Sequence, residues 1–244
     1  HIALIALLIL PSLYWIFYDR SVWPWDPSWY AEMSVKIYHS FEVSIKEGVK
    51  AMVNAFGIKS PGIAWIGMLF VPLGYLTGNM NASLLLAVII AQILNLYFAF
   101  RIFQLLEFRK IYQAVGLLII GSAPLFVGMS HQFFVETFQM LAITLSLYVM
   151  IQSKKWDSYK SIVWLVFILT FAMVIKVTSP LYLFAPTLVT IFNIFSRDKK
   201  GWKNLKFGTR EIAITVLLLG FVGLVALWYT RNWTLIRDFV TLAS

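Results

Sequence analysis

Residues 83–106 read Ser-Leu-Leu-Leu-Ala-Val-Ile-Ile-Ala-Gln-Ile-Leu-Asn-Leu-Tyr-Phe-Ala-Phe-Arg-Ile-Phe-Gln-Leu-Leu. The stretch holds a single charge, Arg101, and neither proline nor glycine. A helix needs roughly 20 mainly apolar residues to cross the hydrocarbon core of a bilayer, so this stretch predicts a membrane-spanning helix. The other apolar runs that are long enough to span a membrane, or nearly so, are residues 2–17, 114–130, 134–151, 161–177, 180–195 and 212–230.

The composition of the 244-residue chain agrees with several spans. Hydrophobic residues make up 60% of it and charged residues 13%, whereas an ordinary soluble domain is about half apolar and a quarter charged. Disorder is excluded because it requires low hydrophobicity. The absence of cysteine excludes disulfides and thiol nucleophiles, and three histidines far apart in sequence argue against a dedicated zinc site. The sequence therefore predicts an all-α fold, a polytopic transmembrane helical bundle.

The chain begins at His1 inside an apolar run, without an initiator methionine, a basic leading segment or a small-residue cleavage site. We interpret residues 2–17 as part of a first transmembrane helix and not as a signal peptide. Residues 1–244 are expected to form a single catalytic-type transmembrane domain, truncated at both ends, from the N-terminal part of a longer protein.

The positive charge is concentrated in three segments between spans. Residues 101–113, 152–160 and 196–210 together carry 12 of the 20 lysines and arginines against three acids. Pairs of spans separate these segments, so they share one side of the membrane, and the positive-inside rule assigns that side to the cytoplasm. The net charge of +9 therefore sets the topology and does not indicate a nucleic-acid partner.

The loop of residues 18–78 is placed on the outer side. Its first part, residues 18–60, carries five basic and five acidic residues and so lacks a basic excess. Apolar residues at helical spacing predict two amphipathic helices on the membrane surface, one along residues 30–41 and one along residues 49–56. Residues 61–77 contain two prolines and three glycines, and we interpret them as a re-entrant or interfacial helix. If they cross the membrane instead, the preceding loop moves to the cytoplasmic side.

Few ionisable residues remain near the outer ends of the spans: Asp26, Lys59, Glu136, Lys176 and Arg231. Ionisable groups at membrane depth are costly and often functional. Each also has a structural explanation, because an Asp before a proline fits a helix N-cap, an acid suits a first helical turn, and cations suit helix ends or interfaces. Together, three cations and two carboxylates on one face predict an outer phosphate-binding cavity with an acid/base pair.

These residues fall in an ordered set of short motifs that resembles the membrane glycosyltransferases of the C superfamily. The similar branch uses polyprenyl-phosphate sugars and includes protein O-mannosyltransferases and bacterial lipid A aminoarabinose transferases. The chain departs from the family pattern at Pro27, Ser60 and Glu136, where the family has an acid, a proline and an aspartate. The motifs in chain order are Asp26-Pro-Ser-Trp-Tyr30-Ala-Glu32, Lys59-Ser-Pro61 with Trp65 and Gly74-Tyr-Leu-Thr-Gly78, Glu136, Ile175-Lys-Val-Thr-Ser179 and Leu227-Trp-Tyr-Thr-Arg231-Asn232.

The resemblance implies a multi-pass enzyme of the plasma or inner membrane with its active site on the outer face (periplasmic, extracellular or lumenal). It implies inverting transfer of a sugar from a polyprenyl-phosphate donor to a lipid, glycan or protein acceptor. Asp26 and Glu136 are the expected catalytic residues, no organic cofactor is implied, and two carboxylates also permit a divalent metal. His131 fits an ordinary interfacial position as well as the site. The residues expected to bind the substrate or its lipid phosphate are Lys59, Lys176, Arg231, Tyr30 and His131.

Two other classes of protein remain open. A transporter or flippase subunit is expected to show inverted repeats and charges buried at mid-membrane, and the sequence shows neither. In a non-catalytic membrane scaffold the outer charges would only anchor helices at the interface. The scaffold hypothesis predicts that Asp26→Asn leaves sugar transfer unchanged.

Overall fold

The computed structural model describes residues 1–18, 23, 25–152, 159–195 and 209–243. Every regular element in this part of the chain is a helix, which confirms the predicted all-α class. The elements in chain order are α1 (Ile2–Tyr18), α2 (Trp25–Val43), α3 (Ile45–Val53), α4 (Gly62–Met68), α5 (Val71–Thr77), α6 (Met80–Leu105), α7 (Lys110–Gly121), α8 (Pro124–Gly128), the 3₁₀ turn η1 (Met129–His131), α9 (Val135–Gln152), α10 (Tyr159–Ile175), α11 (Ser179–Phe195) and α13 (Thr209–Ala243).

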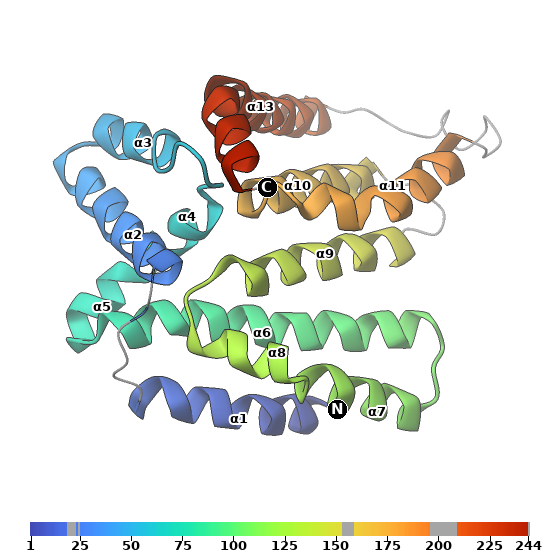
Figure 1. The fold of residues 1–244 in the computed structure, drawn as a ribbon. Coiled ribbons are helices and arrows are strands. Elements are labelled where there is room, and N and C mark those ends of the chain that lie inside the picture. The colour runs from blue at the N-terminus through green and yellow to red at the C-terminus, as the bar shows by residue number, and fades with distance from the viewer. Residues whose placement is uncertain (19–22, 24, 153–158, 196–208, 244) are drawn as a thin grey trace.

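The long helices lie side by side, and their direction alternates along the chain, so that the neighbours α6 and α9 run parallel (Figure 1). α6 packs against α1 and α9, and α10 packs against α9 and α13. Helices α2 to α5 gather at one end of the long helices, where α6 and α9 begin and α10 ends. The α6–α7 connection lies at the opposite end. Residues 153–158 and 196–208, which hold most charges of two predicted basic loops, lie outside the described residues.

Helix α6 lies at the centre of the core, and two buried amides join it to its neighbours. Gln92 Nε2 donates a hydrogen bond to the carbonyl oxygen of Phe126 in α8 at 2.6 Å. Asn95 Nδ2 donates to the carbonyl oxygen of Thr137 in α9 at 3.2 Å. Buried amides need such partners because an unpaired polar group in apolar surroundings is costly. The two contacts fix α8 and α9 relative to α6.

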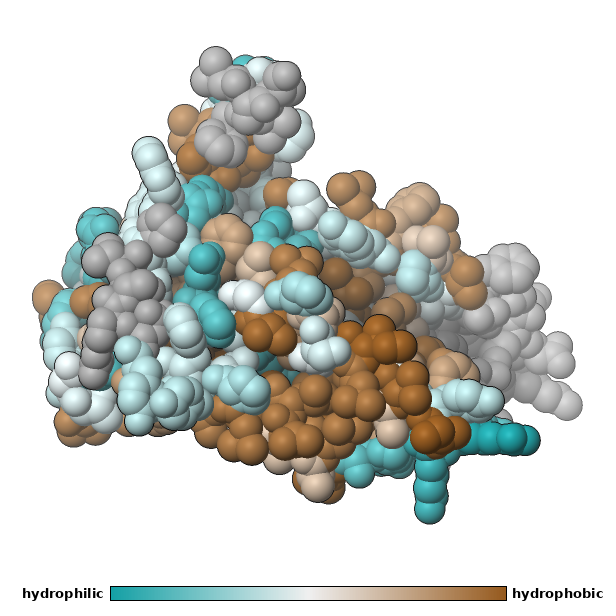
Figure 2. Space-filling view, turned by 60° about the horizontal axis from the view of Figure 1, so that its bottom comes forward, coloured by the Kyte–Doolittle hydropathy of each residue, from teal (hydrophilic) through white to brown (hydrophobic). Residues whose placement is uncertain are grey.

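By length and apolar composition α6 and α9 can each cross a membrane. The pair formed by α7 and the α8–η1 segment counts as a third span if its two arms, bent by 54°, are taken together. Helix α1 and most of α10 are apolar but shorter. Figure 2 shows hydrophobic side chains over the middle of the face that carries α1, with hydrophilic side chains towards its ends.

The structure refines three of the sequence predictions. Residues 61–77 form two seven-residue helices, α4 and α5, each roughly 10 Å long and therefore too short to cross a membrane. Helix α2 begins at Trp25, so Asp26 lies inside its first turn instead of at the N-cap. Helix α13 continues to Ala243, although the span was predicted to end at residue 230. No proline or glycine follows Gly223 in that helix to end it earlier.

Candidate functional site

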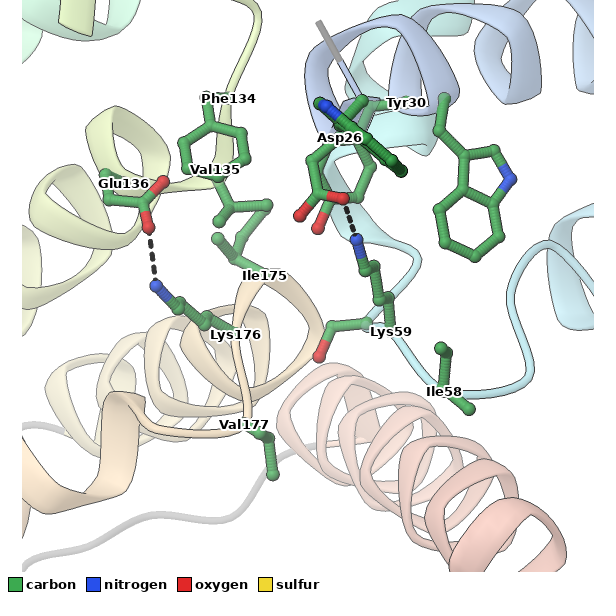
Figure 3. Close-up of a pocket in the computed structure, with 13 residues that line it drawn as sticks. Asp26, Tyr30, Ile58, Lys59, Phe134, Val135, Glu136, Ile175, Lys176 and Val177 are labelled. Carbon is green, nitrogen blue, oxygen red and sulfur yellow. Dashed lines mark hydrogen bonds and ion pairs between the residues drawn. The ribbon is translucent and has the colours of Figure 1, made fainter. Parts of the chain in front are cut away.

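A cavity of about 660 Å³ lies at the end of the bundle where α2 to α5 gather (Figure 3). Its wall comes from four segments far apart in the sequence: the start of α2, residues 58–60, the start of α9 and the turn after α10. The volume is within the range of sites that bind small molecules. Five of the seven residues predicted from the sequence line this cavity: Asp26, Tyr30, Lys59, Glu136 and Lys176.

On one side of the cavity the Lys59 ammonium binds the Asp26 carboxylate. Lys59 Nζ also lies 4.8 Å from the ring centroid of Trp29 and 5.5 Å from that of Tyr30, within range of a cation–π interaction. The Lys59 side chain is 16% exposed, against 41% for Asp26. Trp25 has a φ of 40°, a left-handed conformation that non-glycine residues rarely adopt. Backbone strain is therefore held immediately before the carboxylate.

The second ion pair joins Lys176 Nζ to Glu136 Oε1 at 2.6 Å, and both side chains are 32% exposed. Glu136 lies in the first turn of α9 and Lys176 follows the last residue of α10. Each charge therefore has the sign that its helix end favours. Glu136 Oε2 is buried and has no hydrogen-bond partner among the described residues. The carboxylate therefore keeps an unused acceptor oxygen.

Tyr30 is influenced by both ion pairs. Its side chain is only 5% exposed, and this burial raises the pKa of the hydroxyl above its usual value of 10, with the negative charges of Asp26 and Glu136 raising it further. The phenol therefore stays protonated and can donate a hydrogen bond. Figure 3 shows the two ion pairs as separate contacts, with Lys59 and Asp26 on one side of the cavity and Lys176 and Glu136 on the other.

Two predicted site residues do not line this cavity. Arg231 lines a second cavity, of about 430 Å³, between α3, α4, α10 and α13. His131 lies in η1, where its ring stacks on Trp15 of α1 with the ring centroids 4.5 Å apart. The structure therefore brings five of the seven residues to one cavity and leaves Arg231 and His131 elsewhere, because hydropathy predicts the depth of a residue and not the side of the bundle that it faces.

Sequence reasoning missed Trp29 and Ser60, which also line the cavity. The position of Trp29, three residues after Asp26 in the same helix, was a signal that could have identified it. Tyr229 donates its hydroxyl proton to the carbonyl oxygen of Met173 at 2.6 Å, so Ser60 is the donor in its 2.9 Å bond to the Tyr229 oxygen. No local pattern predicts that contact, because its partners are 169 residues apart.

The cavity carries its own cations. No group of three or more His, Asp or Glu side chains that could hold a metal occurs in the described part of the chain. A lysine binds one oxygen of each carboxylate of the cavity. We therefore assign the positive charge of the site to Lys59 and Lys176.

Comparisons of the chain with protein-family models, with curated proteins and with solved structures found no match. The functional assignment therefore depends on the chemistry of the cavity. Its two lysines can bind an anion, its carboxylates can accept a proton, and Tyr30 can donate a hydrogen bond. A reaction that needs all three groups is the displacement of an anionic leaving group by a hydroxyl or an amine.

Proposed function

We propose that the chain is a polytopic integral-membrane protein whose cavity faces the outer side of the membrane. The length and apolar character of α6 and α9 support this proposal. So does the charge distribution, because the turn between α6 and α7, with Arg109 and Lys110, lies at the opposite end from the cavity. In this orientation α2 to α5 lie at the outer interface, where an amphipathic helix such as α3 is stable.

Within this setting, we propose that the cavity catalyses sugar transfer from a polyprenyl-phosphate donor to a lipid, glycan or protein acceptor. The observation that carries the proposal is the presence of two carboxylate–lysine pairs in one cavity. The acceptor oxygen or nitrogen forms a bond to the anomeric carbon while the bond from that carbon to the phosphate oxygen breaks. The bonding electron pair leaves with the phosphate, and the acceptor proton passes to a carboxylate. Attack opposite to the leaving group inverts the anomeric centre.

The two lysines stabilise the charge that develops on the leaving phosphate. Before the donor arrives, each lysine is bound to a carboxylate. An anionic phosphate competes for the ammonium groups, and a carboxylate that loses its lysine is a better base towards the acceptor. We assign the base to Asp26, which is the more exposed carboxylate. Glu136, on the other side of the cavity, helps to orient the acceptor.

The test is an in vitro transfer assay with the full-length protein in proteoliposomes and polyprenyl-phosphate sugars as donors. Asp26→Asn is expected to lower the rate about 100-fold or more, since a general base contributes roughly 10²- to 10⁴-fold. Asp238→Asn is the matched control, because Asp238 is exposed and paired with Arg237 on α13, away from the cavity. An Asp26→Asn rate equal to that of the control would contradict the proposal and favour a transporter or a scaffold.

A further inference from the structure

The second cavity lies beside the first but is separate from it. Ser60 lines the first cavity and Tyr229 lines the second, and the hydrogen bond between their hydroxyl groups forms part of the wall between them. No residue lines both cavities. The second cavity has a volume of about 430 Å³, which is enough for a site that takes one small molecule or part of a larger one.

The wall of the second cavity is mainly apolar. Aliphatic and aromatic side chains of α3, α4, α10 and α13 and of Pro61 make up all of it except Arg231. Trp65 Nε1 already donates to the carbonyl oxygen of Met52 at 3.1 Å. Trp228 is 7% exposed, and its Nε1 is buried without a hydrogen-bond partner among the described residues. The accessible wall of the cavity is therefore mainly hydrocarbon and aromatic surface, which suits an apolar ligand group.

Arg231 adds a positive charge to the same cavity. It is exposed, and no Asp or Glu in the described part of the chain forms an ion pair with it. Arg231 and Trp228 are three residues apart on α13 and so lie on the same face of that helix. Arg231 lies about 33 Å along the helix from Thr209. This distance is close to the roughly 30 Å thickness of the hydrocarbon core, so in the proposed orientation, with Thr209 near the inner interface, the guanidinium lies at the outer headgroup level.

We propose that the second cavity binds one hydrocarbon chain of an anionic phospholipid, with the lipid phosphate held by Arg231. The apolar wall fits the chain, and the guanidinium matches the geometry of a phosphate. A zwitterionic lipid offers the same chain but carries a cation that Arg231 repels. The site uses neither lysine of the first cavity, so it stands independently of the glycosyl-transfer proposal.

The experiment measures lipid binding to the full-length protein in a neutral detergent by native mass spectrometry. The probes are phosphatidylglycerol and phosphatidylcholine with identical acyl chains. Wild type is expected to hold one phosphatidylglycerol more tightly than phosphatidylcholine, and Arg231→Gln is expected to weaken phosphatidylglycerol binding about tenfold or more. Arg237→Gln is the matched control, since Arg237 lies on the same helix, outside the cavity and paired with Asp238. It should bind the lipid as wild type does.

Val49→Trp supplies a second variant that does not depend on the arginine. Val49 lines the cavity and is 49% exposed, so a tryptophan there narrows the cavity without disturbing a packed core. It should lower the affinity for both lipids. Equal effects of Arg231→Gln and Arg237→Gln would overturn the proposal. So would unchanged binding in Val49→Trp, which would place the lipid outside the second cavity.

Discussion

Replacement of Gly62 by alanine tests how closely α4 must approach α10. A Cβ at position 62 would lie 2.8 Å from the carbonyl oxygen of Val174 and 2.9 Å from both its carbonyl carbon and Ile175 Cδ1. The Val174 atoms belong to the backbone and cannot rotate away. The helices must therefore separate by about 0.6 Å to restore the 3.4 Å of an ordinary contact. Overpacking of this kind costs about 1–3 kcal/mol of folding free energy.

A cost of this size predicts a fall of roughly 2–12 °C in apparent Tm, since each kcal/mol corresponds to about 2–4 °C in a chain of this length. The assay is thermal unfolding in detergent, followed by far-ultraviolet circular dichroism. Gly223→Ala in α13 is the control, because a Cβ there has no neighbour within 4 Å and alanine favours a helix more than glycine does. A Gly62→Ala Tm equal to or above that of Gly223→Ala would refute the close approach of α4 and α10.

Two further predictions concern the core and the cavity. Asn95→Leu removes the bond to the Thr137 carbonyl and the one that Asn95 Oδ1 accepts from Thr144 Oγ1, and should cost about 1–2 kcal/mol. The control is Asn81→Leu at an exposed position of α6, and equal Tm values for the two variants would count against the prediction. The Tyr30→Phe variant tests the pH dependence of stability. Burial raises the pKa of the Tyr30 hydroxyl above 10, so the stabilisation that this hydroxyl provides is complete below pH 10 and is lost as the pH rises further. The variant should lose less Tm above pH 10 than wild type, and identical slopes would contradict this.

Hydropathy predicted the bounds of most long helices to within a few residues, because a membrane-spanning helix is recognised by the length of its apolar run. The predicted spans at residues 83–106 and 134–151 differ from α6 and α9 by three residues or fewer at each end. The region 114–130 was predicted as one span but forms α7 and α8, bent by 54°. Pro124 lacks the N–H that a continuous helix requires there, and Gln92 of α6 binds a carbonyl of the second arm. The first cause was visible in the sequence, and the second depends on tertiary contact.

The candidate site was predictable in part for the same reason. Charge at a helix end near the interface singled out Asp26, Lys59, Glu136 and Lys176, and the structure brings these four residues to one cavity. Arg231 met the same criterion and lines a different cavity. The side of the bundle that Arg231 faces is set by the packing of α13 against α10. The sequence of α13 does not predict this packing, because the helix is apolar around much of its circumference and has no single apolar face.

Pairing each lysine with a carboxylate solves two physical problems of a charged cavity in a mainly apolar protein. Four isolated charges in a partly dry site would each lack compensation, whereas two close pairs leave the cavity electrically neutral and less costly to form. The pairs also hold segments that are remote in the sequence, since Asp26 binds the loop before α4 and Glu136 binds the turn after α10. Removal of either lysine therefore changes both the charge of the cavity and the position of its wall. Asp26→Asn and Glu136→Gln keep the shape of the side chain. They therefore separate the effect of charge from that of wall position better than any substitution of Lys59 or Lys176.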